Sequence, residues 1–410
     1  MCGVYGTLLI DGRTDLNRGL ASTSFVSKLS EQIIDSFDFD VEGQSSAVYV
    51  RDLETSLSFV SENKGICVGM CTDNCNTMRK TREDFAAMHL DILCYACTDH
   101  MLDLLMNYFA EATICAEVIS RVKAIQNVFR KHSRILSALK TVNNYLLPCV
   151  PGETRWHYAS EMMENYLANH TSLIVCSHLD EVQSLIEPYS GQLTWLYDAT
   201  FTNSVKRVLE LLEPFKLAIK DAESDRCPAE KVVDIWITLK LKIDTLPVHT
   251  WRSTDARANF IKKFDDHLMA ISDGHLAAYY LHPRYDNSRC ASTLKKRAVD
   301  YCVRKGINND FLVQWFMKDY TCLGIPAPLD FVETNKTKSL KLFWKYCAAE
   351  STSPAIIDVM KLALRLDGSN FHYSYTRADI QHLLRHSFQQ KTQSPAISTC
   401  SPDSFFAKAF

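Results

Sequence analysis

The sequence predicts an α/β protein with a mixed sheet near the N-terminus and helices through most of the remaining chain. In the first hundred residues, short apolar runs alternate with helical patterns in the order β-β-β-α-β-α-β-α. Three successive strands followed by such alternation are typical of a mixed sheet with helices on its faces. From about residue 114 to residue 350 the apolar residues recur at helical spacing.

The expected strands are short and apolar. Residues 4–10 form the first, which is predicted to end at Asp11, and the segments STSFVSKLS and EQIIDSFDFDV form the next two. Residues 66–71 give the fourth strand, which ends in Thr72-Asp73-Asn74, and DILCYAC gives the fifth. Helices are expected in SAVYVRDLETSLSFVSEN, TMRKTREDFAAM and TDHMLDLLMNYFAEA, and later in AEVISRVKAIQNVFRKHSRILSALK, EMMENYLANHTSLIVCSHL, NSVKRVLELLEPFKLAIKDAES and AEKVVDIWITLKLKIDTL.

Length and composition limit the class of protein. A chain of 410 residues exceeds the usual size of a single core, so we expect two or three structural units. The net charge of -3 lacks the basic excess of an autonomous nucleic-acid binder, although charge can be distributed unevenly. The 15 cysteines and the lack of a secretory leader indicate reduced thiols in cytosol or nucleus. Because no window reaches about 18 apolar residues, we expect no membrane association. Because the sequence starts abruptly at a core strand, we expect that a domain is missing upstream, either lost or left out of this sequence.

Two acidic residues follow buried strands. Asp11 and Asp73 lie 62 residues apart, in IDGR and CTDN. Carboxylates at neighbouring strand ends can share Mg²⁺ or Mn²⁺, and two such ions support phosphodiester cleavage. Ordinary turn and cap chemistry explains the same residues equally well.

The segment around residues 89–100 has the composition of a zinc site. His89, Cys94, Cys97 and His100 supply thiol and imidazole groups, and Cys71 and Cys75 lie nearby in the sequence. Side chains on a strand alternate between faces, so Cys94 and Cys97 converge only if the chain turns between them. We therefore expect no zinc, although a zinc-dependent regulator remains an alternative function.

Seven segments, from Gly3 to about Ser369, resemble in order those of the hAT (hobo, Ac and Tam3) transposase superfamily, particularly the branch with the domain of unknown function 659. The segments are GVYGTLLIDGRTDLNRG, VGMCTDNCNTMRKTRE, CTDHMLDLL, ETRWHYASEMMENYL, LLEPFKLAIKDAES, HLAAYYLHPRYD and LKLFWKYCAAESTSPAIIDVMKLALRLDGS. The resemblance implies an RNase H-like mixed sheet interrupted by a large all-helical insertion, with a C-terminal helical segment that returns to the core. It divides the chain into a first core part at 1–150, an insertion at 151–335, a dimerisation and core-helix segment at 336–390, and a loose tail at 391–410.

The resemblance also assigns roles to individual residues. It makes Asp11 and Asp73 the first two catalytic acids and metal ligands, with Mg²⁺ or Mn²⁺ as the cofactor. Cys97 and His100 match the family's C-x-x-H motif, which supports the active site. Arg155 and Trp156 match its DNA-contacting R-W dipeptide, in which the ring stacks near the DNA. A buried aromatic that anchors the following helix is the alternative for Trp156.

The sequence departs from the family pattern at three points. The tryptophan expected after Asp11-Gly12 is Arg13, a cation that competes with a metal for the carboxylate. The third acid, a glutamate after the serine run, is missing, and Asp379 is the nearest carboxylate on the expected helix. The zinc finger of the BED type that commonly precedes the family's core is not in this sequence.

These observations favour a degenerate or domesticated hAT transposase-like protein. We expect it to keep the fold and the dimerisation surface in the nucleus as a homo-oligomer, with weak DNA binding and an incomplete acidic triad. The alternative is an active transposase that cleaves and joins DNA by metal-dependent chemistry.

Overall fold

The computed structural model describes residues 4–15, 18–27, 31–38, 45–142, 147–148, 157–224, 227–285, 291–318, 320–323, 325, 340–350 and 353–369. All of them belong to one compact unit, Met1–His372. None of the described helices is long and apolar enough to cross a membrane.

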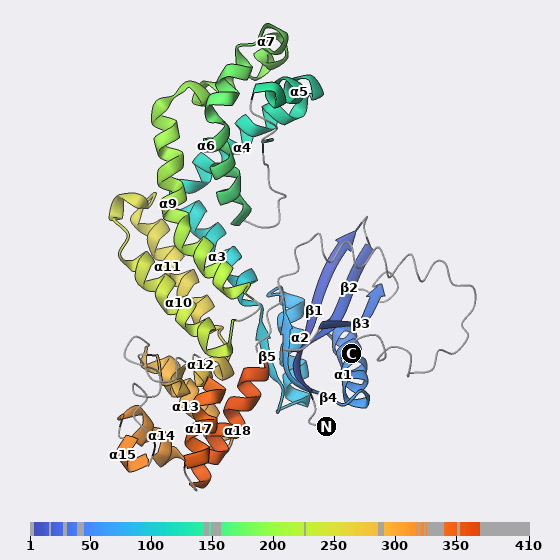
Figure 1. The fold of residues 1–410 in the computed structure, drawn as a ribbon, viewed down its shortest axis with the longest axis vertical. Coiled ribbons are helices and arrows are strands. Elements are labelled where there is room, and N and C mark those ends of the chain that lie inside the picture. Colours follow the sequence, from blue (N-terminus) through green and yellow to red (C-terminus); the bar gives the residue numbers. More distant parts are fainter. Residues whose placement is uncertain are drawn as a thin grey trace, which may run out of the picture. The chain divides into compact units, whose positions relative to one another are not determined.

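A five-stranded mixed sheet lies in the N-terminal part (Figure 1). Its order is β3-β2-β1-β4-β5; the pairs β3–β2 and β2–β1 are antiparallel, whereas β1–β4 and β4–β5 are parallel. The predicted α/β class with a mixed sheet is therefore confirmed, as is the order of its first eight elements. The strands are β1 (Val4–Asp15), β2 (Arg18–Ser27), β3 (Glu31–Asp38), β4 (Gly65–Thr72) and β5 (Leu93–Ala96).

The first strand is longer than the sequence predicts. It continues past Asp11 to Asp15, so the prediction that the strand ends before Asp11 is wrong. The apolar pattern stops at Ile10, but the antiparallel partner β2 still offers backbone groups beyond it, pairing Asp11 with Ser22. Pairing to a neighbouring strand, which local hydrophobicity does not report, extends β1.

One face of the sheet packs against α1 (Ser46–Glu62) and α2 (Asn76–Met88). Leu8 and Met70 on the strands share an apolar cluster with Leu53 of α1 and Phe85 of α2. The α1 helix begins where the Ser45 hydroxyl accepts a hydrogen bond from a first-turn backbone N–H. Burial of these apolar side chains holds both helices against the strands.

The C-terminal helix α18 (Pro354–Ser369) contacts β1 and β4. It also packs against α17 (Leu340–Glu350) and α12 (Asp273–Leu281) in a second apolar cluster, near β5 (Figure 1). Within this cluster the Trp344 indole N–H donates to the carbonyl of Leu281 at 3.0 Å. Helix α18 therefore packs on β1 and β4 although it follows them by more than 250 positions in the sequence.

Most of the remaining helices share a third core, which extends from Met101 to Ala298. The helix expected over residues 116–140 is divided, because His132 takes an extended backbone conformation between α4 and α5. The other described α-helices are α3 (Thr98–Ala112), α4 (Cys115–Lys131), α5 (Ser133–Val142), α6 (His157–Ser177), α7 (Asp180–Ile186), α8 (Ser190–Leu193), α9 (Ala199–Ala222), α10 (Ala229–Asp244), α11 (Thr254–Met269), α13 (Ser292–Arg304), α14 (Asn309–Phe316) and α15 (Tyr320–Leu323).

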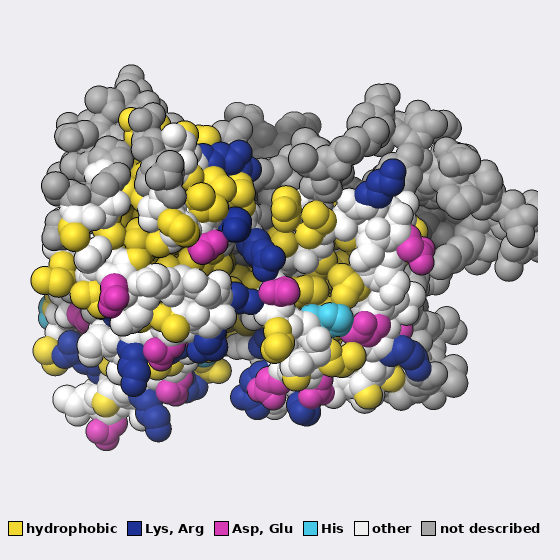
Figure 2. Space-filling view, turned by 90° about the horizontal axis from the view of Figure 1, so that it is seen from below, with side chains coloured by type: hydrophobic (Ala, Val, Ile, Leu, Met, Phe, Trp, Pro, Cys, Tyr) yellow, Lys and Arg dark blue, Asp and Glu magenta, His cyan; other side chains and the backbone are white. Residues whose placement is uncertain are grey.

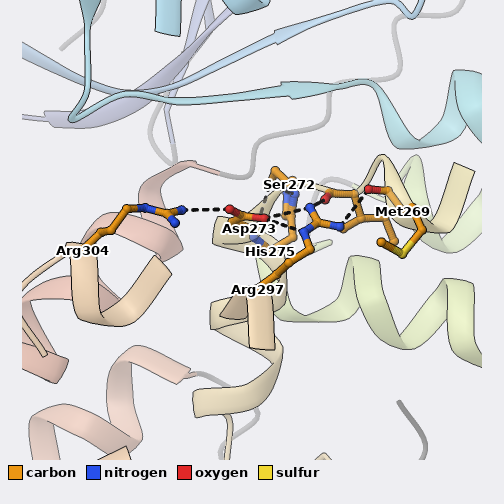
Figure 3. A network of polar contacts seen from close by, with 7 residues as sticks. Met269, Ser272, Asp273, His275, Arg297 and Arg304 are labelled. Carbon is orange, nitrogen blue, oxygen red and sulfur yellow. Dashed lines mark hydrogen bonds and ion pairs between the residues drawn. The ribbon is translucent and has the colours of Figure 1, made fainter. Parts of the chain in front are cut away.

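A polar network joins α11, α12 and α13 (Figure 3). The Arg297 guanidinium donates to the Asp273 carboxylate at 2.8 Å and to the carbonyls of Met269 and Ile271. Arg304 donates to the other oxygen of Asp273 at 2.9 Å. Charge-assisted bonds of this kind fix the start of α12, the helix that touches β5 through Leu93.

Candidate functional site

The backbone register brings the two predicted acids to neighbouring positions. Ile10 of β1 is the partner of Thr72 of β4 in the parallel ladder, and this is the last parallel pair between the two strands. Asp11 and Asp73 are the residues that follow Ile10 and Thr72, so they leave this ladder side by side. The Asp11 side chain lies outside the described part, whereas Asp73 is half-buried.

The Asp73 loop connects β4 to α2 and is held by short-range hydrogen bonds. The Asp73 carboxylate oxygen Oδ1 accepts a bond from the backbone N–H of Cys75 at 3.1 Å. The Thr72 hydroxyl donates to the carbonyl of Asp73 at 2.7 Å. Both bonds fix the backbone on either side of the carboxylate, as Asx-type turns do.

Arg82 of α2 contacts three consecutive residues of this loop. Its Nη1 donates to the Thr72 hydroxyl at 2.5 Å and to the carbonyl of Asp73, and its Nη2 donates to the Asn74 side-chain oxygen at 2.9 Å. The Arg82 side chain is almost fully buried, with 9% of its surface exposed. Burial lowers the pKa of the guanidinium, whereas nearby thiols and Asp73 favour its charge. The site therefore contains a buried cation beneath the loop.

The C-x-x-H pair begins α3 as the sequence predicts, but its two side chains have different neighbours. Cys97 is the N-cap residue, and its backbone N–H donates to the carbonyl of Thr72 at 2.8 Å. Its thiol donates a hydrogen bond to the Asp99 carboxylate. A hydrogen bond with the free thiol of Cys71, together with burial, raises the pKa of Cys97 well above the usual value. His100 instead acts on His267 of α11, whose pKa is lowered mainly by burial and to a smaller extent by the charges of Lys263 and His100. Cys97 is thus tied to the end of β4, next to Asp73.

The other two residues of the possible zinc set are engaged elsewhere. His89 pairs with Glu54 of α1, and its ring lies 4.5 Å from that of Phe85. Cys94 packs against the apolar cluster of the sheet, and burial raises its pKa to about 12. In the described part of the chain, no group of three or more histidine, cysteine or acidic side chains has the spacing of a metal site.

Helix α18, which contacts β1 and β4, carries two carboxylates that the structure describes. Asp358 pairs with Lys361 at 3.1 Å, and Asp367 pairs with Lys341 at 3.5 Å. Both are neutralised by lysines, and neither forms a three-acid group with Asp73. The described carboxylates therefore do not fit the acid set that a two-metal site needs.

Three residues named from the sequence fall outside the described part of the chain. Arg155 and Trp156, the dipeptide expected to contact DNA, precede α6, and Asp379 follows α18. The Arg13 side chain is also outside it, although its backbone lies in β1 opposite Leu20. Their predicted roles stay predictions.

Comparison with protein-family models and with curated proteins finds no match to this chain.

Arg82 is the site residue that the sequence analysis missed. Residues Met78, Thr81, Arg82 and Phe85 are the buried positions of α2, so the arginine lies on the inward face of the helix. A cation at an apolar position of an amphipathic helix was the available signal, since such a charge is rarely buried without partners.

Proposed function

We propose that the chain is a hAT transposase-like protein with an RNase H-like sheet that binds DNA in the nucleus and no longer cleaves it. The observation that carries the proposal is the backbone pairing of Ile10 with Thr72, because Asp11 and Asp73 are the residues that follow them in the sequence. The third acid of the family pattern, a glutamate after the serine run, is missing from the sequence, in which Glu350 is the last glutamate. Two acids alone do not hold two metal ions in the geometry that strand cleavage requires.

The sheet topology supports the RNase H-like assignment. An antiparallel β3–β2–β1 unit extended by parallel β4 and β5, in that order, is the arrangement that the resemblance implies. Contact of α18 with β1 and β4 fits the C-terminal helix that is expected to return to the core.

Uneven charge supports DNA binding despite the acidic balance of the whole chain. Helices α4 and α5 carry a single acid, Glu117, against a set of basic residues. This set, here called the α4–α5 basic segment, is Arg121, Lys123, Arg130, Lys131, Arg134 and Lys140. Lysine and arginine that neutralise phosphates release counterions, and this release drives sequence-independent binding.

Exposed apolar residues support self-association. The face shown in Figure 2 carries apolar side chains interspersed with lysines and arginines. On α17, Leu342 and Tyr346 are one turn apart and are 47% and 42% exposed. Phe343 and Trp344 of the same helix are buried in the chain's own core, so only the outer face of α17 is available to a second copy.

An active transposase is the second candidate. It is favoured by the adjacency of Asp11 and Asp73 at the end of the parallel ladder, which is the placement that metal sharing requires. It needs a third acid from the residues beyond α18, for which Asp379 is the candidate.

DNA binding is tested by titrating fluorescent duplex DNA with the full chain at several salt concentrations. We expect the logarithm of the association constant to fall with the logarithm of salt. Arg134→Gln, in the α4–α5 basic segment, should weaken binding and reduce this slope by about 0.9 if the residue contacts one phosphate. Lys262→Gln, a charge removal on the exposed side of α11, is the control. Binding that is independent of salt, or equally affected by both changes, would contradict the proposal.

A further inference from the structure

Arg82 is placed to control the Asp73 loop. It reaches across from the second turn of α2 and donates to Thr72, the last residue of β4, and to Asp73 and Asn74, which follow it. None of these bonds goes to the Asp73 carboxylate, whose Oδ1 is held by the Cys75 N–H. The guanidinium therefore binds the Asp73 carbonyl and the side chains of the residues on either side of Asp73, and so restrains the loop that presents the carboxylate.

The charge of Arg82 has a second effect. It interacts favourably with the negative charge of Asp73 in the same loop. Loops that collect carboxylates for metal ions generally need the ion to offset repulsion and to fix their geometry. Here the chain supplies a positive charge of its own, the guanidinium of Arg82, beside Asp73.

We propose that Arg82 is a positioning residue that holds Asp73 in place without a metal ion. The inference rests on the proposed role of Asp73 and explains how a loop derived from a metal site stays ordered after the ion is lost. It follows that the order of the Thr72–Asn74 loop depends on the guanidinium fork and is independent of divalent cations. A lysine at this position keeps the charge but cannot reach three residues at once.

The test is amide hydrogen exchange of the full chain, followed peptide by peptide, with and without MnCl₂. The Cys75 amide, bonded to Asp73 Oδ1, is the local reporter, and the β4 amides report on the sheet. In the wild-type protein we expect the loop to be protected to the same extent with and without manganese. Arg82→Gln should speed exchange in the loop roughly tenfold more than in β4, because three bonds to a charged donor are lost. Arg79→Gln, at an exposed position on the same helix, should change the exchange rate of neither the loop nor β4.

Three results would overturn the proposal. They are protection of the wild-type loop only when manganese is present, loop exchange in Arg82→Gln equal to that in Arg79→Gln, and equal acceleration in the loop and in β4. If Arg82→Gln does not fold, the same exchange measurement is made on Arg82→Lys. Faster exchange confined to the loop supports positioning, and unchanged exchange contradicts it. Cleavage of DNA by the wild-type protein would overturn the proposed function and leave this exchange result standing.

Discussion

Ile10 and Thr72 are the last partners of the parallel ladder between β1 and β4. Every functional expectation for the site depends on this pair, because the next residue on each strand is one of the two acids. The carboxylate of Asp73 accepts a hydrogen bond from the Cys75 N–H of its own loop, and the backbone carbonyl of Asp73 accepts one from Arg82. The structure thus presents the Asp73 carboxylate directly after a strand, in a loop held by hydrogen bonds.

Asp273 is predicted to be a stabilising residue. It accepts hydrogen bonds from Arg297 and Arg304, which tie α12 to α13 (Figure 3). Asp273→Asn should lower the free energy of unfolding by about 1 to 2 kcal/mol, because it weakens charge-assisted bonds at a partly exposed site. Asp358→Asn, which breaks an exposed pair with Lys361, should change it by less than about 0.5 kcal/mol. Urea denaturation measures both, and equal effects would contradict the prediction.

Trp344 should anchor α17 to α12. Its ring is fully buried, and its indole N–H donates to the carbonyl of Leu281. Trp344→Phe keeps most of the apolar contact but leaves that carbonyl unpaired, at a cost of about 1 to 3 kcal/mol. Trp344→Ala should cost about 3 to 5 kcal/mol, since it also leaves a cavity. Chemical denaturation gives both values. A stability of Trp344→Phe equal to wild type would show that the bond contributes nothing.

His267 should make stability depend on pH. Burial lowers its pKa by more than the hydrogen bond between its Nδ1 and the carbonyl of Lys263 raises it, so the folded protein favours the neutral ring. The unfolded chain then binds a proton at a higher pH than the folded chain, near the ordinary histidine pKa. The contribution of His267 is therefore complete above about pH 6.5 and decreases as the pH falls below it.

The His267 prediction is checked by urea denaturation at pH 7.5 and at lower pH, on the wild type and on His267→Gln. We expect the variant to lose less stability on acidification than the wild type. His178→Gln, at an exposed histidine, is the control and should retain the wild-type dependence. An identical pH dependence in wild type and His267→Gln would refute the assignment.

The outer face of α17 is predicted to mediate self-association. The double substitution Leu342→Glu and Tyr346→Glu places charge in an apolar contact and should convert an oligomer to a monomer. Leu90→Glu alters a leucine that is 80% exposed elsewhere in the chain and should have no effect. Light scattering after size-exclusion chromatography distinguishes the species. A wild-type protein that is strictly monomeric at all concentrations would exclude this surface as an interface.

The order of the N-terminal elements could be predicted because it depends on local patterns. Apolar runs such as residues 66–71 and the helical spacing of Leu53 and Val60 are visible in the sequence without knowledge of the fold. The end of β1 could not be predicted in this way. Its last residues are strand because β2 pairs with them, and that pairing is set by the hairpin as a whole.

The candidate site was predictable in part. Asp73 follows a buried strand, and that placement is confirmed, whereas its support by Arg82 depends on how α2 docks against β4. The pairing of His89 with Glu54 likewise depends on how elements pack, because the two residues lie 35 positions apart in the sequence. A sequence shows which residues can serve a site, but contacts between elements decide which of them do.

Cleavage of DNA by the full chain in the presence of Mn²⁺ is the most direct measurement. Duplex DNA with a nick or a free end is incubated with the wild type, with Asp73→Asn, and with the control Asp91→Asn, and DNA binding is measured in the same samples. We expect all three proteins to bind DNA and none to release cleaved product. Manganese-dependent product from the wild type and from Asp91→Asn, lost in Asp73→Asn, would show that the chemistry survives and would contradict the proposed function.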